Sequence, residues 1–211
     1  MNSGLSTIRV VVMLSGGGTT LQNFIDLSES GRLPIQITKV IASRGDAYGL
    51  QRAQKHNIPT VVVSRKKFND WADYNQALTD AVDAEQPDLV LFAGFMSLFW
   101  PGESYTGRIM NVHPALIPAF CGKGMYGHHV HEAVIESGVK ITGCTVHFVD
   151  GQYDTGPIIL QRPIEVLDDD TPDSLAERVQ ELERQIYPEA VNLFIQNRLQ
   201  IQQRRVKILA F

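Results

Sequence analysis

The stretch IRVVVMLSGGGTTLQNFI, residues 8–25, decides the fold. Its opening run, 8–14, is apolar and rich in β-branched residues, which is typical of a strand. Glycines follow directly, and apolar residues then recur at helical spacing, at Leu21, Phe24 and Ile25. The stretch therefore predicts a strand, a glycine turn and a helix.

The alternation of strand and helix continues toward the middle of the chain. The run LVLF at 89–92 is wholly apolar, which indicates a strand buried on both faces. Such strands form parallel sheets that helices cover, with right-handed crossovers. Further strands are predicted at 35–42 and 60–63, and helices at 50–56 and 71–85.

The second half begins with the strand IMNVH, 109–113, which runs into Pro114. Proline at 118 keeps the following segment from forming a regular helix. Because the carboxyl ends of strands form the ligand crevice in open α/β sheets, polar residues at this strand end are candidates for function. A further strand pair that extends the sheet is predicted at 143–149 and 158–164, joined by the loop 150–157.

The last predicted helix starts at Thr171, a capping hydroxyl followed by proline at the first helical position. Pro188 is expected to kink or divide this helix. No repeat or change of composition marks a linker, so residues 1–211 are expected to form a single α/β domain. It has a mostly parallel, Rossmann-like sheet flanked by helices, with an antiparallel strand pair added in the C-terminal half.

Charge and composition exclude several classes of protein. A net charge of −4 disfavours a broad nucleic-acid-binding surface, and the short basic tail 198–207 is the only candidate for one. Cys121 and Cys144 neither define a disulfide framework nor complete a zinc site. No apolar run has the length of a membrane span or of a signal segment. We therefore expect a cytoplasmic protein, and the composition alone names no function.

The glycine turn SGGGTTL, 15–21, is a candidate anion site. At a strand-to-helix turn, backbone N–H groups and the helix dipole attract a phosphate group. The turn lacks the lysine of a Walker A loop, and Leu21 stands where a dinucleotide fingerprint requires glycine. A tight turn without any ligand remains the alternative interpretation.

Asn111, His113 and Asp154 are the candidate catalytic residues. Strand alternation sends Asn111 and His113 to the same face. An amide can donate to an oxygen that gains negative charge, and an imidazole can move a proton or stabilise the same oxygen. A nearby carboxylate such as Asp154 would hold or charge the imidazole. The alternative interpretation, that His113 is a structural histidine beside a capping asparagine, remains open.

Two further groups of histidines stand out. His128, His129 and His131 follow the glycine-rich stretch 121–127, and a helix start explains them better than a metal site because no HExxH motif or carboxylate triad accompanies them. His147 lies in an otherwise apolar strand, which favours a structural or supporting role. We expect no metal.

Five motifs together resemble the phosphoribosylglycinamide formyltransferases, folate-dependent enzymes of purine synthesis. They are SGGGTTLQ (15–22), AGFM (93–96), NVHPALIP (111–118), GCTVHFVD (143–150) and DTGPIILQ (154–161), and they run over nearly the whole chain. The resemblance implies transfer of the formyl group of 10-formyltetrahydrofolate to the amine of 5'-phosphoribosylglycinamide, giving the formylated product and tetrahydrofolate. It also implies that residues 1–100 bind phosphate and that residues 101–211 bind folate and carry out catalysis.

The resemblance further implies roles for individual residues. Asn111, His113 and Asp154 become the catalytic trio. The residues implied to bind the substrate phosphate and ribose are Gly18, Thr19, Thr20, Leu21, Gln180 and Glu183. The residues implied to bind the folate are Met96, Ser97, Leu98, Phe99, Asn111 and Asp150.

Two departures and several alternatives remain. Trp71 stands where family members often carry an arginine, so a contact with the folate tail is in doubt, and the stretch 121–127 is longer than in some members. Formyltetrahydrofolate hydrolase and methionyl-tRNA formyltransferase share the trio-like motif but normally need an extra domain. A non-catalytic phosphate-binding module is the alternative from another class. The sequence does not fix the oligomeric state, and a homodimer stays open.

Overall fold

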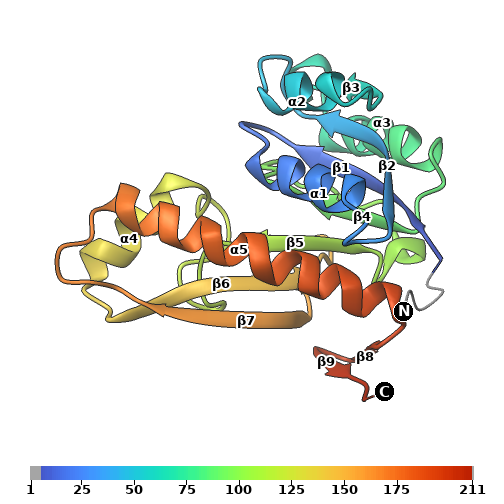
Figure 1. Cartoon of the computed structure of the whole chain (residues 1–211). Coiled ribbons are helices and arrows are strands. Elements are labelled where there is room, and N and C mark those ends of the chain that lie inside the picture. The colour runs from blue at the N-terminus through green and yellow to red at the C-terminus, as the bar shows by residue number, and fades with distance from the viewer. Residues whose placement is uncertain (1–5, 211) are drawn as a thin grey trace. The chain divides into compact units, whose positions relative to one another are not determined.

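The structure, a computed structural model, describes residues 6–210. The chain divides into two compact units, Met1–Met110 and Asn111–Phe211. Both contain strands and helices, so the predicted α/β class is confirmed. Figure 1 shows the elements of each unit along the chain.

The first unit carries four parallel strands in the order β3-β2-β1-β4. Central β1 pairs with β2 on one side and β4 on the other, and its residues 10–14 are fully buried. This explains why its sequence is apolar on both faces. The unit's elements are β1 (Ile8–Leu14), α1 (Thr19–Glu29), β2 (Ile35–Ala42), α2 (Gly49–Lys55), β3 (Thr60–Val62), α3 (Trp71–Asp83) and β4 (Leu89–Phe92), with short 3-10 helices at Arg65–Lys67 and Glu103–Tyr105.

The glycine turn between β1 and α1 has a conformation that depends on glycine. Gly18, the N-cap of α1, has φ 72°. A Cβ atom at Gly18 would lie 2.6 Å from the Cα atom of Gly49. A side chain is therefore excluded both by backbone conformation and by the close approach of α2.

The second unit is built around an antiparallel strand pair. Strands β6 and β7 pair from Ile141 opposite Glu165 to His147 opposite Ile158, and α5 packs on both strands (Figure 1). The strand order is β5-β6-β7-β9-β8. The unit's elements are β5 (Ile109–His113), α4 (His128–Ser137), β6 (Ile141–Phe148), β7 (Ile158–Glu165), α5 (Pro172–Ile195), β8 (Leu199–Gln202) and β9 (Arg205–Ile208).

Two predictions about the last part of the chain are corrected. Helix α5 runs unbroken through Pro188, so the prediction that this proline divides the helix is wrong. Buried residues on both sides of it, among them Tyr187 and Ala190, hold the two halves of α5 against the strand pair. The segment treated above as a basic tail forms the β8–β9 hairpin, with Gln203 at φ 56° in the turn. No helix within residues 6–210 has the length and apolar character needed to span a membrane.

Candidate active site

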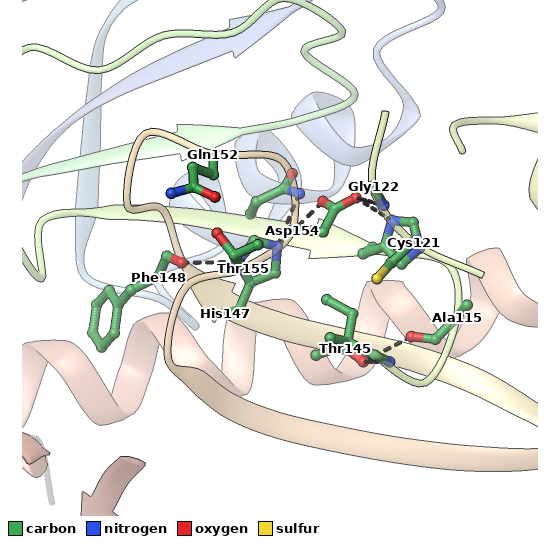
Figure 2. Close-up of polar contacts among 12 residues, drawn as sticks. Ala115, Cys121, Gly122, Thr145, His147, Phe148, Gln152, Asp154 and Thr155 are labelled. Atoms are coloured by element: carbon green, nitrogen blue, oxygen red, sulfur yellow. Dashed lines mark hydrogen bonds and ion pairs between the residues drawn. The ribbon is translucent and has the colours of Figure 1, made fainter. Parts of the chain in front are cut away.

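The side chains of Asn111, His113 and Asp154 converge in the second unit. Asn111 and His113 lie at the end of β5, and Asp154 lies in the loop between β6 and β7. One carboxylate oxygen of Asp154, Oδ2, is 3.6 Å from Nδ1 of His113, and the other, Oδ1, is 3.6 Å from Nε2 of His147. Asn111 reaches the same place through His147, because its Nδ2 atom lies 3.2 Å from Nε2 of that ring. Figure 2 shows His147 beside Asp154.

The loop that carries Asp154 is held by contacts specific to its residue types. Asp154 has φ 56°, and its Oδ2 accepts a hydrogen bond of 2.9 Å from the backbone N–H of Gly122. Thr155 donates to Asp150 at 2.7 Å. A Cβ atom at Gly156 would lie only 1.7 Å from the carbonyl oxygen of Phe148. The Asp-x-Gly sequence is thus required by the geometry that presents the carboxylate.

Asn111 is oriented by His147. The Nδ1–H group of His147 donates to the carbonyl oxygen of Phe148 at 2.8 Å, which leaves its Nε2 atom for a second partner. The Nδ2 atom of Asn111 lies 3.2 Å from this Nε2 atom and donates to it. The second amide hydrogen of Asn111 has no acceptor among the described residues, and it is available to a ligand.

His113 is a buried, neutral imidazole. Its Nε2–H group donates to the carbonyl oxygen of Phe120 at 2.8 Å, and the residue is 3% exposed. Burial lowers the pKa of His113 below its ordinary value of 6.5, and the charge of Asp154, which acts in the opposite direction, does not overcome this effect. The Nδ1 lone pair therefore faces the carboxylate and can take up a proton.

Asp154 is an ionised carboxylate. Burial alone would raise its pKa, but His147, His113 and the N–H of Gly122 together lower the pKa below the ordinary value of 3.8. The site therefore pairs one negative charge with two imidazoles. This arrangement can hold a proton that arrives at His113.

Of two supporting residues, Thr145 was not predicted, whereas a structural or supporting role was expected for His147. Thr145 accepts from the N–H of Ile117 and from Gln161 and donates to the carbonyl of Ala115 at 2.7 Å, so it anchors the segment that follows β5. Thr145 and His147 stand two residues apart on β6, and alternation along this strand was the signal that could have linked them to one face. Which face of β6 meets β5 could not be predicted from the residues alone.

The histidine group 128–131 lies at the start of α4, as predicted, although the N-cap is Gly127 without a side-chain cap. His128 contacts Glu132 at 3.0 Å and Asp173 at 2.9 Å. His131 is 4% exposed, and its Nδ1 atom has no partner among the described residues. Burial, with smaller contributions from His128 and His113, lowers the pKa of His131 to about 4. None of residues 6–210 forms a group of three or more His, Cys, Asp or Glu suited to a metal ion.

In the first unit, the predicted phosphate site is the N-terminus of α1. Helix α1 has no side-chain cap, so its first N–H groups point outward from the turn at Gly18, Thr19 and Thr20. The side chain of Leu21 is fully buried, so this residue can offer only its backbone to a ligand. The predicted folate contact begins with Met96, which is 47% exposed, and ends with Phe99, which is fully buried.

Gln180 and Glu183 lie on α5 in the second unit. Gln180 is exposed and Glu183 is half-buried. Burial raises the pKa of Glu183 to about 8, against a smaller opposing effect of Arg184. A glutamate held in such an environment is a candidate for contact with a ligand.

We expect Glu183→Gln to stabilise the protein in a pH-dependent way. Wild-type folding takes up a proton at Glu183 between pH 4.5 and about 8, so wild-type stability falls as pH rises through this window. Glutamine does not titrate, so the gain grows from none near pH 4.5 to about 1–3 kcal/mol near pH 8. Urea unfolding at several pH values measures it, with exposed Glu177→Gln as the control. A gain that does not change with pH would contradict the expectation.

Comparison with known proteins identifies the family. The formyl transferase family matches residues 8–191. The chain is 36% identical to a phosphoribosylglycinamide formyltransferase of Haemophilus influenzae over 92% of this chain and 90% of the relative, and 34% identical to that of Escherichia coli over 92% and 90%. Glycinamide ribonucleotide transformylase 1 of Symbiobacterium toebii superposes with a TM-score of 0.90 at 40% identity, over 99% of this chain and 96% of that chain. The chain belongs to the formyl transferase family.

Proposed function

We propose that Asn111, His113 and Asp154 catalyse transfer of the formyl group of 10-formyltetrahydrofolate to the amine of 5'-phosphoribosylglycinamide. The products are the formylated glycinamide and tetrahydrofolate, in purine synthesis. The single observation that carries the assignment is the convergence of an amide, a neutral imidazole and an ionised carboxylate at the end of β5. These groups suit acyl transfer, in which negative charge develops on a carbonyl oxygen while a proton leaves the amine.

Asn111 stabilises the oxyanion. When the substrate amine attacks the formyl carbon, the formyl oxygen becomes negative, and the second amide hydrogen of Asn111 is the donor for it. His147 fixes this direction, because its Nε2 atom accepts the other amide hydrogen at 3.2 Å. A donor already oriented in this way loses little energy to reorganisation during the reaction.

His113 carries the proton. Its Nδ1 atom takes up the proton that the attacking amine releases, directly or through water, and the resulting imidazolium lies 3.6 Å from Asp154. This positive charge adds to the stabilisation of the nearby oxyanion. The bond between the formyl carbon and the folate nitrogen then breaks, and that nitrogen receives a proton in exchange.

The remaining proposed contacts are those with the phosphate and ribose of the substrate and with the folate. The N–H groups at Gly18–Leu21 hold the substrate phosphate, and Gln180 and Glu183 hold the phosphate and ribose. The residues 96–99, together with Asn111 and Asp150, hold the folate. The uncapped N-terminus of α1 and the raised pKa of Glu183 support these assignments. We further propose a cytoplasmic location, in keeping with two free cysteines, and sedimentation will test whether the chain forms a homodimer.

An assay with purified protein tests the function. Formyl transfer is followed with and without phosphoribosylglycinamide: release of tetrahydrofolate only in its presence supports transfer, and equal release without it would identify a hydrolase. No release under either condition would leave only a binding module.

Asp154→Asn tests the role of the carboxylate. Loss of the charge removes the stabilisation that Asp154 gives to a protonated His113, so kcat is expected to fall by about 10- to 100-fold. The acid limb of the pH–rate profile should move to lower pH, because Asp154 raises the pKa of His113 and the amide does not. An unmoved acid limb would show that Asp154 does not act through His113.

A further inference from the structure

A cavity lined mostly by polar and charged residues lies in the first unit. It has a volume of about 180 Å³, and its lining residues come from the carboxyl ends of β1, β2 and β3 and from the segment after β4. They are Ser15, Ser43, Arg44, Ser64, Arg65, Lys66, Met96 and Ser97. The lining thus carries three cations and several hydroxyl groups, and among the described residues no carboxylate lines it.

The floor of the cavity offers a hydrogen-bond donor. Ser15 and Ser43 are 5% and 7% exposed, and their hydroxyl oxygens are 2.6 Å apart. The Ser15 oxygen also accepts from the backbone N–H of Met96 at 2.9 Å. Of the two hydroxyl hydrogens, one makes the bond between the serines, and the other has no acceptor within residues 6–210. The hydroxyl hydrogen without a partner can therefore donate to an acceptor on a ligand, and an oxyanion supplies such an acceptor.

The rim of the cavity carries more positive than negative charge. Arg44 is paired with Asp46 at 2.6 Å. Among the described residues, Arg65 has polar contacts with the backbone carbonyl of Phe68 and the ring of Tyr74, neither of which neutralises its charge. Lys66 makes no hydrogen bond or close ion pair with any described residue, although its charge also acts on Asp46. Two cations above a buried hydroxyl donor favour a ligand with negatively charged oxygens.

We propose that this cavity binds the oxyanion group of a small molecule, a carboxylate or a phosphate, and that this site is distinct from the N–H groups of Gly18–Leu21, which do not line the cavity. Its volume is below the roughly 300 Å³ at which pockets begin to hold whole drug-sized ligands, so it takes one charged group rather than a whole cofactor. The carboxylate source would be the glutamyl end of the folate, and this assignment alone rests on the proposed function, because Met96 and Ser97 belong to the proposed folate contact. The phosphate source would be a free or esterified phosphate.

Calorimetric titration of the full chain tests the site. The probes are glutarate and inorganic phosphate, each at an ionic strength held constant with sodium chloride. The variant R65Q/K66Q removes the two rim cations, and K67Q, the next residue, which does not line the cavity, is the matched control. We expect at least one probe to bind, with about tenfold weaker binding in R65Q/K66Q and a change of less than about twofold in K67Q.

The outcomes separate the alternatives. Tighter binding of glutarate assigns the site to carboxylates, and tighter binding of phosphate assigns it to phosphates. The proposal is overturned if neither probe binds at tens of millimolar, or if R65Q/K66Q binds both probes as K67Q does. Formyl transfer by the wild type is assayed separately, so failure of the proposed function is distinguished from failure of this site.

Discussion

Asn111→Ala is expected to lower kcat by about 10²–10³-fold and to leave the protein folded. In the proposed mechanism, the variant removes the amide hydrogen of Asn111 that donates to the reacting oxygen. Loss of one oxyanion donor in comparable enzymes has an effect of this size, because the donor acts on charge that appears only in the transition state. Steady-state kinetics with both substrates measures it, and KM should change much less than kcat.

Gln152→Ala is the matched control for this variant. Gln152 lies in the same loop as Asp154, its side chain is exposed, and among the described residues this side chain makes no hydrogen bond (Figure 2). The control should keep wild-type kcat within about twofold, as expected for a surface substitution away from the reacting atoms. Turnover of Asn111→Ala close to the wild-type value would remove Asn111 from the mechanism.

Much of the fold could be predicted because its signals are local. The strand at Ile8–Leu14 and the strand at Leu89–Phe92 have the predicted bounds, since each is a short apolar run with clear limits. The bounds of the helix at Gly49–Lys55 shifted by one residue, because no capping side chain marks either end. The hairpin at the C-terminus was not predicted. Its turn places Gln203 in the left-handed region, whereas the sequence patterns that predict such a turn have glycine or asparagine there.

The candidate site was predictable only in part. Spacing placed Asn111 and His113 on one face, but their meeting with Asp154 depends on the pairing of strands far apart in the chain. The direction in which the pKa of His113 shifts could not be predicted either. Burial lowers this pKa and the carboxylate raises it, and only the structure gives the extent of burial. The role of His147 stayed open between structural and supporting for the same reason, because the partners of a buried imidazole cannot be predicted from its own strand.

Gly156→Ala is expected to destabilise the protein by about 3 kcal/mol or more, because overpacking next to rigid backbone has few routes of relief. The added Cβ atom would lie 1.7 Å from the carbonyl oxygen of Phe148, so this carbonyl must move. That same oxygen accepts the Nδ1–H of His147, which orients Asn111. Activity should therefore fall even at temperatures where the variant remains folded.

Thermal unfolding and kinetics together check this expectation. For a chain of this size, the loss corresponds to a fall in Tm of roughly 6–12 °C. Gly45→Ala is the control: nothing lies within 4 Å of a Cβ atom there, so Tm should stay within a few degrees of the wild type. If Gly156→Ala melted like the control, the close approach of the loop to Phe148 would be wrong. If it melted early but kept full kcat, the link from Phe148 through His147 to Asn111 would not control catalysis.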